Sequence, residues 1–172
     1  NLTQLFRLLL GVMIFAALAA LLRRRPEPDR VVAAMATATA IHAALGVLDV
    51  ASAAAGLPQL LDPIRTANYA ILADHYMVGV KRMIGGFPEA SAFGFYALGL
   101  YGFWLAYWVR APGSRLALWM LAVSALVLFR STSSAAYVAA LAFTVTWGLW
   151  AAAAHLRAEA SRRGVALAAT GV

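Results

Sequence analysis

The chain alternates between long apolar stretches and short polar connections rich in arginine, proline and glycine. A membrane helix needs about 20 mostly apolar residues. Five stretches approach or exceed that length: Leu2–Leu22, Val31–Leu57, Ala90–Val109, Leu116–Phe129 and Ala135–Ala154. The pattern therefore predicts an all-α, polytopic bundle of about five transmembrane helices with one structured extracytoplasmic loop.

Three details refine this expectation. Leu116–Phe129 is short for a membrane span, so we expect its helix to continue into Arg130 and the serines that follow. A charged cytoplasmic tail follows Ala154, and we expect Val165–Val172 to begin a further helix. The chain begins at Asn1 rather than at a methionine, so we expect it to be a fragment of a larger bundle.

Residues 58–89 form a polar loop between two helices (residues 1–57) and the three helices and tail that follow (residues 90–172). Asp62 before Pro63 is typical of a helix start, with an N-cap and a proline at the first position, which predicts a short helix through about Tyr76. Pro88 and Glu89 are expected to form the first turn of the next helix, where the helix dipole favours a carboxylate.

The composition agrees with a membrane protein. Of the 172 residues, 63% are hydrophobic and 12% are charged, and the mean hydropathy is +0.78. In soluble globular proteins about a quarter of the residues are charged. The sequence contains no cysteine, which excludes disulfides and thiol chemistry.

The location of the cations explains the net charge of +7. Short connections rich in Lys and Arg stay in the cytoplasm. Nine of the 14 cations fall in three such connections: Arg23, Arg24, Arg25, Arg30, Arg110, Arg115, Arg157, Arg162 and Arg163. These connections alternate as five crossings require, so the 58–89 loop and the 130–134 turn are expected on the other side, in the periplasm. The charge thus reflects membrane orientation and gives no support for a nucleic-acid partner.

Four further cations lie on or near the expected outer face: Arg65, Lys81, Arg82 and Arg130. The planar fork of arginine suits phosphate, so this group predicts binding of a diphosphate or another anion. The alternative is anchoring to lipid head groups, which fits Arg65 and Lys81 best. Arg130 precedes four hydroxyl residues, which favours a wet cavity over an interfacial anchor.

Acidic and loop residues complete the candidate site. Glu89 can accept a proton from a sugar hydroxyl or orient it; alternatively it stabilises its helix or pairs with Arg82. Asp49 lies within an apolar stretch, where an acid is a functional candidate unless it is hydrated at the helix end. Tyr69 and His75 can contact sugar or solvent. The three histidines lack metal-ligand spacing, and no nucleotide-binding glycine loop occurs, so we expect neither a metal nor a cofactor.

The segment Arg82–Phe93 reads RMIGGFPEASAF. It resembles the signature of the O-antigen polymerase and ligase superfamily, in which an arginine, two spacers, a glycine and a Phe-Pro pair open a membrane helix. The FPEASAF wording is more similar to the exopolysaccharide-polymerase branch. A Ser-Arg pair that opens a later helix in the family is not present, because Ala135 follows Ser134 and Arg130 lies upstream. The resemblance covers roughly residues 31–154.

This resemblance implies a metal-independent, membrane-embedded glycosyltransferase in a bacterial inner membrane, with its active side facing the periplasm. A hydroxyl of one lipid-linked oligosaccharide would attack the anomeric carbon of another, and undecaprenyl diphosphate would leave. The implied partners are polyprenyl-diphosphate-linked oligosaccharides, membrane lipids and other polysaccharide-assembly proteins.

The resemblance also implies roles for individual residues. Arg82 and Arg130 are expected to stabilise the departing diphosphate, and Glu89 to orient the acceptor. The expected substrate-binding residues are Arg65, Lys81, Tyr69, His75, Gly85 and Phe87. Two other functions stay open. One is a ligase that transfers finished glycan to lipid A core or to protein, and the other is a transporter or lipid-binding scaffold, for which internal repeats would be expected.

Overall fold

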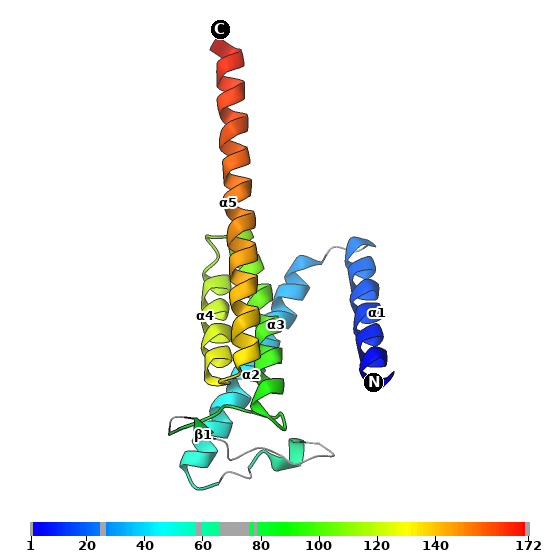
Figure 1. Ribbon diagram of the computed structural model, residues 1–172, viewed down its shortest axis with the longest axis vertical. Helices are drawn as coiled ribbons and strands as arrows, with labels where there is room; N and C mark the ends of the chain where they lie inside the picture. Colours follow the sequence, from blue (N-terminus) through cyan, green and yellow to red (C-terminus); the bar gives the residue numbers. More distant parts are fainter. Residues whose placement is uncertain (1, 25–26, 58–59, 66–75, 78, 171–172) are drawn as a thin grey trace. The chain divides into compact units, whose positions relative to one another are not determined.

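The computed structural model describes residues 2–24, 27–57, 60–65, 76–77 and 79–170. The chain divides into two compact units, residues 1–37 and residues 38–172. Five α-helices make up most of the described chain (Figure 1): α1 (Leu2–Arg24), α2 (Pro28–Ala54), α3 (Ala90–Arg110), α4 (Arg115–Arg130) and α5 (Ser134–Thr170). The predicted all-α class is confirmed, because a helix forms over each of the five apolar stretches.

Among the residues that the structure describes, three segments are long and apolar enough to cross a membrane: Pro28–Ala54, Ala90–Arg110 and Ser134–Glu159. Large apolar side chains are also exposed along the helices, including Trp119 at 68%, Leu126 at 62% and Val138 at 70%. Many exposed large apolar side chains suit contact with lipid rather than water. These features are those of a membrane protein.

The core of the second unit lies where α3 packs against α4 and α5, which run beside it (Figure 1). Phe93 and Ala97 of α3 are buried here together with Val127 of α4 and Ala136 of α5. The indole of Trp104 is also buried, and its Nε1 donates a hydrogen bond to Thr39 Oγ1 of α2 at 2.8 Å. The α3 helix therefore connects α2 to the α4–α5 pair.

The helix α4 ends at Arg130, so the expectation that it continues into the serines is wrong. Ser131 Oγ donates to Leu128 O at 2.6 Å, and the next residue, Thr132, takes a left-handed backbone conformation with φ of 51°. Ser133 Oγ then accepts the N–H of Ala136 and starts α5. Hydroxyl side chains compete in this way with helical backbone bonds. With 16 residues, α4 is roughly 24 Å long.

The helix α5 has 37 residues and is continuous from Ser134 to Thr170, so the expected tail and further helix are one extension of it. At the last turn of α3, the Arg110 guanidinium lies 5.1 Å from the ring of Trp147 and 5.6 Å from that of Trp150. Arginine and tryptophan are typical of membrane–water interfaces. This contact lies at the end of α3 opposite to Glu89.

The loop before α3 contains a 3-10 turn, η1 (Asp62–Ile64), and two short antiparallel strands, β1 (Tyr76–Met77) and β2 (Val80–Lys81). The predicted helix begins as a 3-10 turn at Asp62–Ile64, and Tyr76, its expected end, lies in β1; residues 66–75 of this prediction lie outside the described residues. The N-cap residue of this turn is Leu61 rather than the predicted Asp62, and the Asp62 carboxylate accepts a hydrogen bond from Arg65.

The start of α3 also differs from the expectation. Glu89 is the N-cap residue with extended backbone, so Pro88 and Glu89 precede the first turn rather than forming it. The Glu89 carboxylate does not cap the helix.

Candidate functional site

The segment that follows β2 lies against the end of α4. The Met83 N–H donates to Arg130 O at 3.1 Å, and Arg130 Nη2 donates to Lys81 O at 3.4 Å. These bonds join chain segments that are almost fifty residues apart in sequence, and they place Arg82 next to the Arg130 turn. Two of the three predicted catalytic residues therefore meet at one place.

The Arg82 guanidinium donates hydrogen bonds to the turn between α4 and α5. Its Nε donates to Thr132 Oγ1 at 2.6 Å, and its Nη2 donates to Thr132 O at 3.2 Å. The left-handed conformation of Thr132 is unfavourable for a β-branched residue, and such strain often occurs at functional sites.

Arg82 and Arg130 are both partly buried and therefore remain partly accessible. Within the ranges that the structure describes, neither guanidinium forms an ion pair with a carboxylate. Their hydrogen bonds go to neutral hydroxyl and carbonyl oxygens. Two neighbouring cations without a described counter-charge are suited to bind an anion with two negative groups.

Asp49 of α2 forms a second cluster, which we call the Asp49 cluster: Asp49, Arg65 and Lys81. Asp49 is fully buried, and its Oδ1 accepts from Arg65 Nη2 and from Lys81 Nζ, each at 2.5 Å. The side chains of Arg65 and Lys81 are 0% and 6% exposed. Burial of this kind excludes the alternative that either cation extends to lipid head groups.

The other oxygen of Asp49 accepts hydrogen bonds from the backbone of the segment Arg82–Phe93. Its Oδ2 accepts the backbone N–H groups of Ile84 and Gly85 at 2.9 and 3.2 Å, and Gly85 O accepts from Arg65 Nε at 2.9 Å. Gly85 has φ of 55°, and a Cβ on it would lie 2.8 Å from the ring of Phe93. The predicted substrate-binding residues Arg65, Lys81 and Gly85 thus each bond the Asp49 carboxylate, and Arg65 also bonds Gly85.

Sequence reasoning placed Asp49 among the open candidates and not in the site. The signal was an acid in an otherwise apolar helix, which is typically paired and conformationally important. The alternative that Asp49 is simply hydrated is wrong, because it is fully buried and both of its oxygens accept hydrogen bonds from protein. Its partners could not be read from the sequence, since they come from loop residues 16 and 32 positions away.

Glu89 lies at the start of α3 and is partly buried. Its Oε1 accepts a hydrogen bond from Ser91 Oγ at 2.5 Å. Among the described residues it forms no ion pair with Arg82. The second carboxylate oxygen is left to accept a hydrogen bond from a ligand.

Phe87 belongs to an aromatic group around His42 of α2. The His42 ring stacks on Phe93 with centroids 4.1 Å apart, and it meets Phe87 edge-on at 5.8 Å and Tyr96 at 4.9 Å. The buried His42 Nε2 has no hydrogen-bond partner in the described part of the chain. Phe87 therefore packs the motif onto α2 and remains partly accessible.

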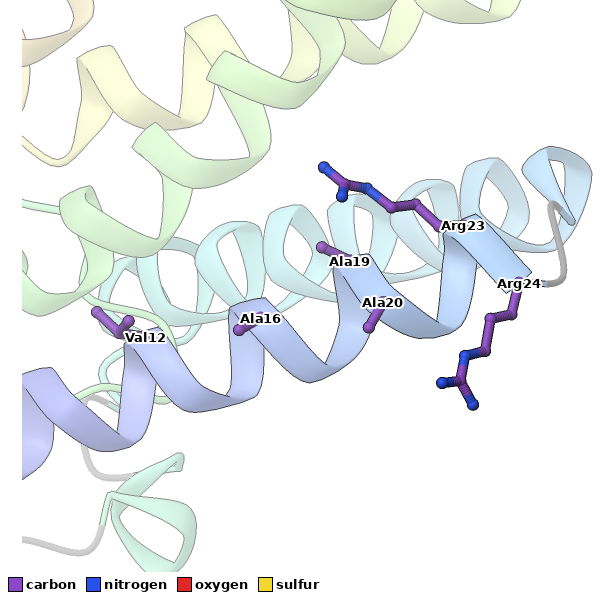
Figure 2. Close-up of a pocket in the computed structure, with 6 residues that line it drawn as sticks. All are labelled: Val12, Ala16, Ala19, Ala20, Arg23 and Arg24. Atoms are coloured by element: carbon purple, nitrogen blue, oxygen red, sulfur yellow. The ribbon is translucent and has the colours of Figure 1, made fainter.

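The two remaining predicted site residues, Tyr69 and His75, lie outside the described residues. Among the residues described, no group of three His, Cys, Asp or Glu side chains could hold a metal ion. A hollow on α1 is lined by none of the predicted site residues (Figure 2): its lining residues are Val12, Ala16, Ala19, Ala20, Arg23 and Arg24.

Comparison of the chain with protein families, characterised proteins and solved structures gives no match. The resemblance of Arg82–Phe93 to the O-antigen polymerase and ligase superfamily therefore stays a prediction.

Proposed function

We propose that this chain is part of a membrane-embedded polysaccharide polymerase. In this proposal, an oligosaccharide is transferred from undecaprenyl diphosphate to a hydroxyl of a second lipid-linked oligosaccharide. The observation that carries the proposal is the meeting of Arg82 and Arg130 beside a strained, hydroxyl-rich turn, without a carboxylate partner among the described residues. The resemblance of Arg82–Phe93 to polymerase sequences supplies the substrate class.

The proposed reaction is a single displacement. The acceptor oxygen forms a bond to the anomeric carbon, the bond from that carbon to the phosphate oxygen breaks, and undecaprenyl diphosphate leaves with the bonding electrons. Negative charge grows on the diphosphate, so guanidinium groups that bind it stabilise the transition state more than the substrate. Arg82 and Arg130 have this role, and Glu89 accepts the proton of the acceptor hydroxyl or orients it.

The proposed orientation places this site at the outer face of a bacterial inner membrane, with all five helices crossing the bilayer. The α3 helix supports it, because its 21 residues span roughly 32 Å, close to the thickness of the hydrocarbon core. Glu89 and the motif lie at one end of α3, whereas Arg110 contacts two tryptophans at the other end. The connection that holds Arg110 and Arg115 would then face the cytoplasm.

The test is Arg82→Ala in the full-length protein, expressed in a strain from which the gene has been deleted. We expect polymer to be lost, by about 10²-fold or more, because removal of one charge-stabilising donor typically has this effect on kcat. Arg115→Ala is the matched control, since Arg115 is exposed at the far end of α4. The amount of each variant in the membrane is measured by immunoblot.

Polymer of normal length from Arg82→Ala would overturn the proposal. Glycan analysis also separates polymerase from ligase. A polymerase variant accumulates single repeat units on the lipid carrier, whereas a ligase variant accumulates finished chains that are not attached to lipid A core or protein.

A further inference from the structure

Asp49 holds the motif on both sides of Arg82. One of its oxygens bonds the side chain of Lys81, which directly precedes Arg82. The other bonds the backbone N–H groups of Ile84 and Gly85, which follow two and three residues later. Each oxygen thus accepts two hydrogen bonds, and Arg82 lies within a short segment that one buried carboxylate holds at both ends.

The position of Arg82 directly after β2 explains the direction in which its side chain points. Successive side chains of an extended chain point to opposite faces. Lys81 ends β2 and points to Asp49, and the next side chain, Arg82, bonds Thr132 on the α4–α5 turn. With Lys81 fixed on Asp49, Arg82 is directed toward the turn that also carries Arg130.

Asp49 also determines which cations remain for a ligand. If Arg65 or Lys81 turned toward an anion, it would break a buried ion pair with Asp49, and breaking such a pair is strongly unfavourable. Those two cations therefore stay in the Asp49 cluster. The charge of an incoming anion meets Arg82 and Arg130 instead.

We infer that Asp49 is a positioning residue, which fixes the segment 81–85 so that Arg82 faces a lipid diphosphate bound at the α4–α5 turn. This inference rests on the proposed function. It gives Asp49, a residue without expected contact to substrate, a measurable effect on substrate binding through Arg82.

The test uses variants of the full-length protein in lipid nanodiscs. Asp49→Asn alone removes the carboxylate that Lys81 bonds and leaves Arg65 paired with Asp62, so a buried positive charge is no longer balanced and the variant is expected to fold poorly. The double variant Asp49→Asn with Lys81→Met removes one negative and one positive charge together and keeps the local charge balance. Asp62→Asn is the matched control, because Asp62 also bonds Arg65 but touches none of the residues 81–85 through a hydrogen bond.

The first readout is affinity for undecaprenyl diphosphate, used alone as the probe, in a double-mutant cycle with Arg82→Ala. In the protein that retains Arg82, we expect the Asp49/Lys81 double variant to bind about tenfold more weakly. In the Arg82→Ala background, the same double variant should cause no further loss. An equal loss in both backgrounds, or no loss when Arg82 is present, would overturn the inference.

The second readout separates this inference from the proposed function. Hydrogen exchange of the Ile84 and Gly85 amides should be slow in the wild type and in Asp62→Asn, and faster in the double variant, because Asp49 is their acceptor. Unchanged exchange would overturn the positioning role by itself. If the wild type fails to bind undecaprenyl diphosphate, the proposed function fails, and faster exchange in the double variant still supports Asp49 as the residue that fixes the segment.

Discussion

The two pairs of cations near the motif have opposite environments. Arg65 and Lys81 are buried around one carboxylate and bond it at 2.5 Å. Arg82 and Arg130 are partly exposed, and the bonds that they donate go to neutral oxygens of Thr132 and Lys81. The first pair holds the loop onto α2, and the second pair is the one that we propose binds the ligand.

Lys81 and Arg82 show that position in sequence does not determine this division. The two residues are neighbours in the chain, yet one lies in each pair, because the Lys81 side chain bonds Asp49 whereas the Arg82 side chain bonds Thr132. What separates the pairs is a carboxylate from another helix. A cation in an apolar protein therefore indicates function only once its counter-charge is known.

The largest expected effect comes from the buried pair. Arg65→Ala should lower the free energy of unfolding by about 3 kcal/mol, because it removes one of the two buried cations that pair with Asp49 and also the donor that bonds Gly85 O. The measurement is unfolding in mixed micelles followed by tryptophan fluorescence. The control Arg115→Ala, at an exposed position, should stay near the wild type. If Arg65→Ala lowered the free energy of unfolding by less than the loss of a solvent-exposed ion pair would, Arg65 would not belong to the pair of cations that stabilises the fold.

A smaller effect is expected at the turn. Thr132→Val keeps the shape and branching of the side chain but removes the hydroxyl that accepts from Arg82 Nε. We expect the unfolding free energy to fall by about 1 kcal/mol, as for one hydrogen bond. Affinity for undecaprenyl diphosphate should fall as well, because Arg82 loses an orienting contact.

Thr132→Ser retains the hydroxyl and is the control for this change. It should preserve both the stability and the affinity. If Thr132→Val binds undecaprenyl diphosphate as tightly as Thr132→Ser does, the turn does not orient Arg82 for the ligand, and the contrast between the two pairs of cations is weaker than proposed.

The helices were predictable because apolar length alone specifies them. Sequence reasoning found α2 and α3 to within a few residues, since apolar runs end at charged or proline residues. The end of α4 was missed because Ser131 and Thr132 bond the local backbone, which an apolar pattern does not reveal. Likewise, Asp62 was predicted to be a helix N-cap, but its carboxylate accepts a hydrogen bond from Arg65.

The candidate site was predictable in composition but not in arrangement. The motif indicated Arg82, and the serines after Arg130 indicated a polar turn, yet their contact depends on pairing between Met83 and Arg130 across 47 positions of chain. The role of Asp49 could not be predicted from the sequence for the same reason. Its four donors come from the loop that follows α2, and only the folded chain brings them to it.

The smallest effect is expected when the more exposed of the two acids that bond Arg65 is replaced. Asp49 is fully buried, whereas the Asp62 side chain is 40% exposed at 3.0 Å from Arg65 Nη1. Asp62→Asn should lower the unfolding free energy by about 0.5 kcal/mol, since solvent screens exposed pairs and the asparagine oxygen can still accept a hydrogen bond. Raising the salt concentration should reduce the effect of Asp62→Asn on the unfolding free energy further, because dissolved ions screen the attraction between exposed charges. The effect of Arg65→Ala should persist at high salt, because its main partner is buried. A large, salt-independent loss in Asp62→Asn would show that the exposed acid, and not Asp49 alone, holds the loop to α2.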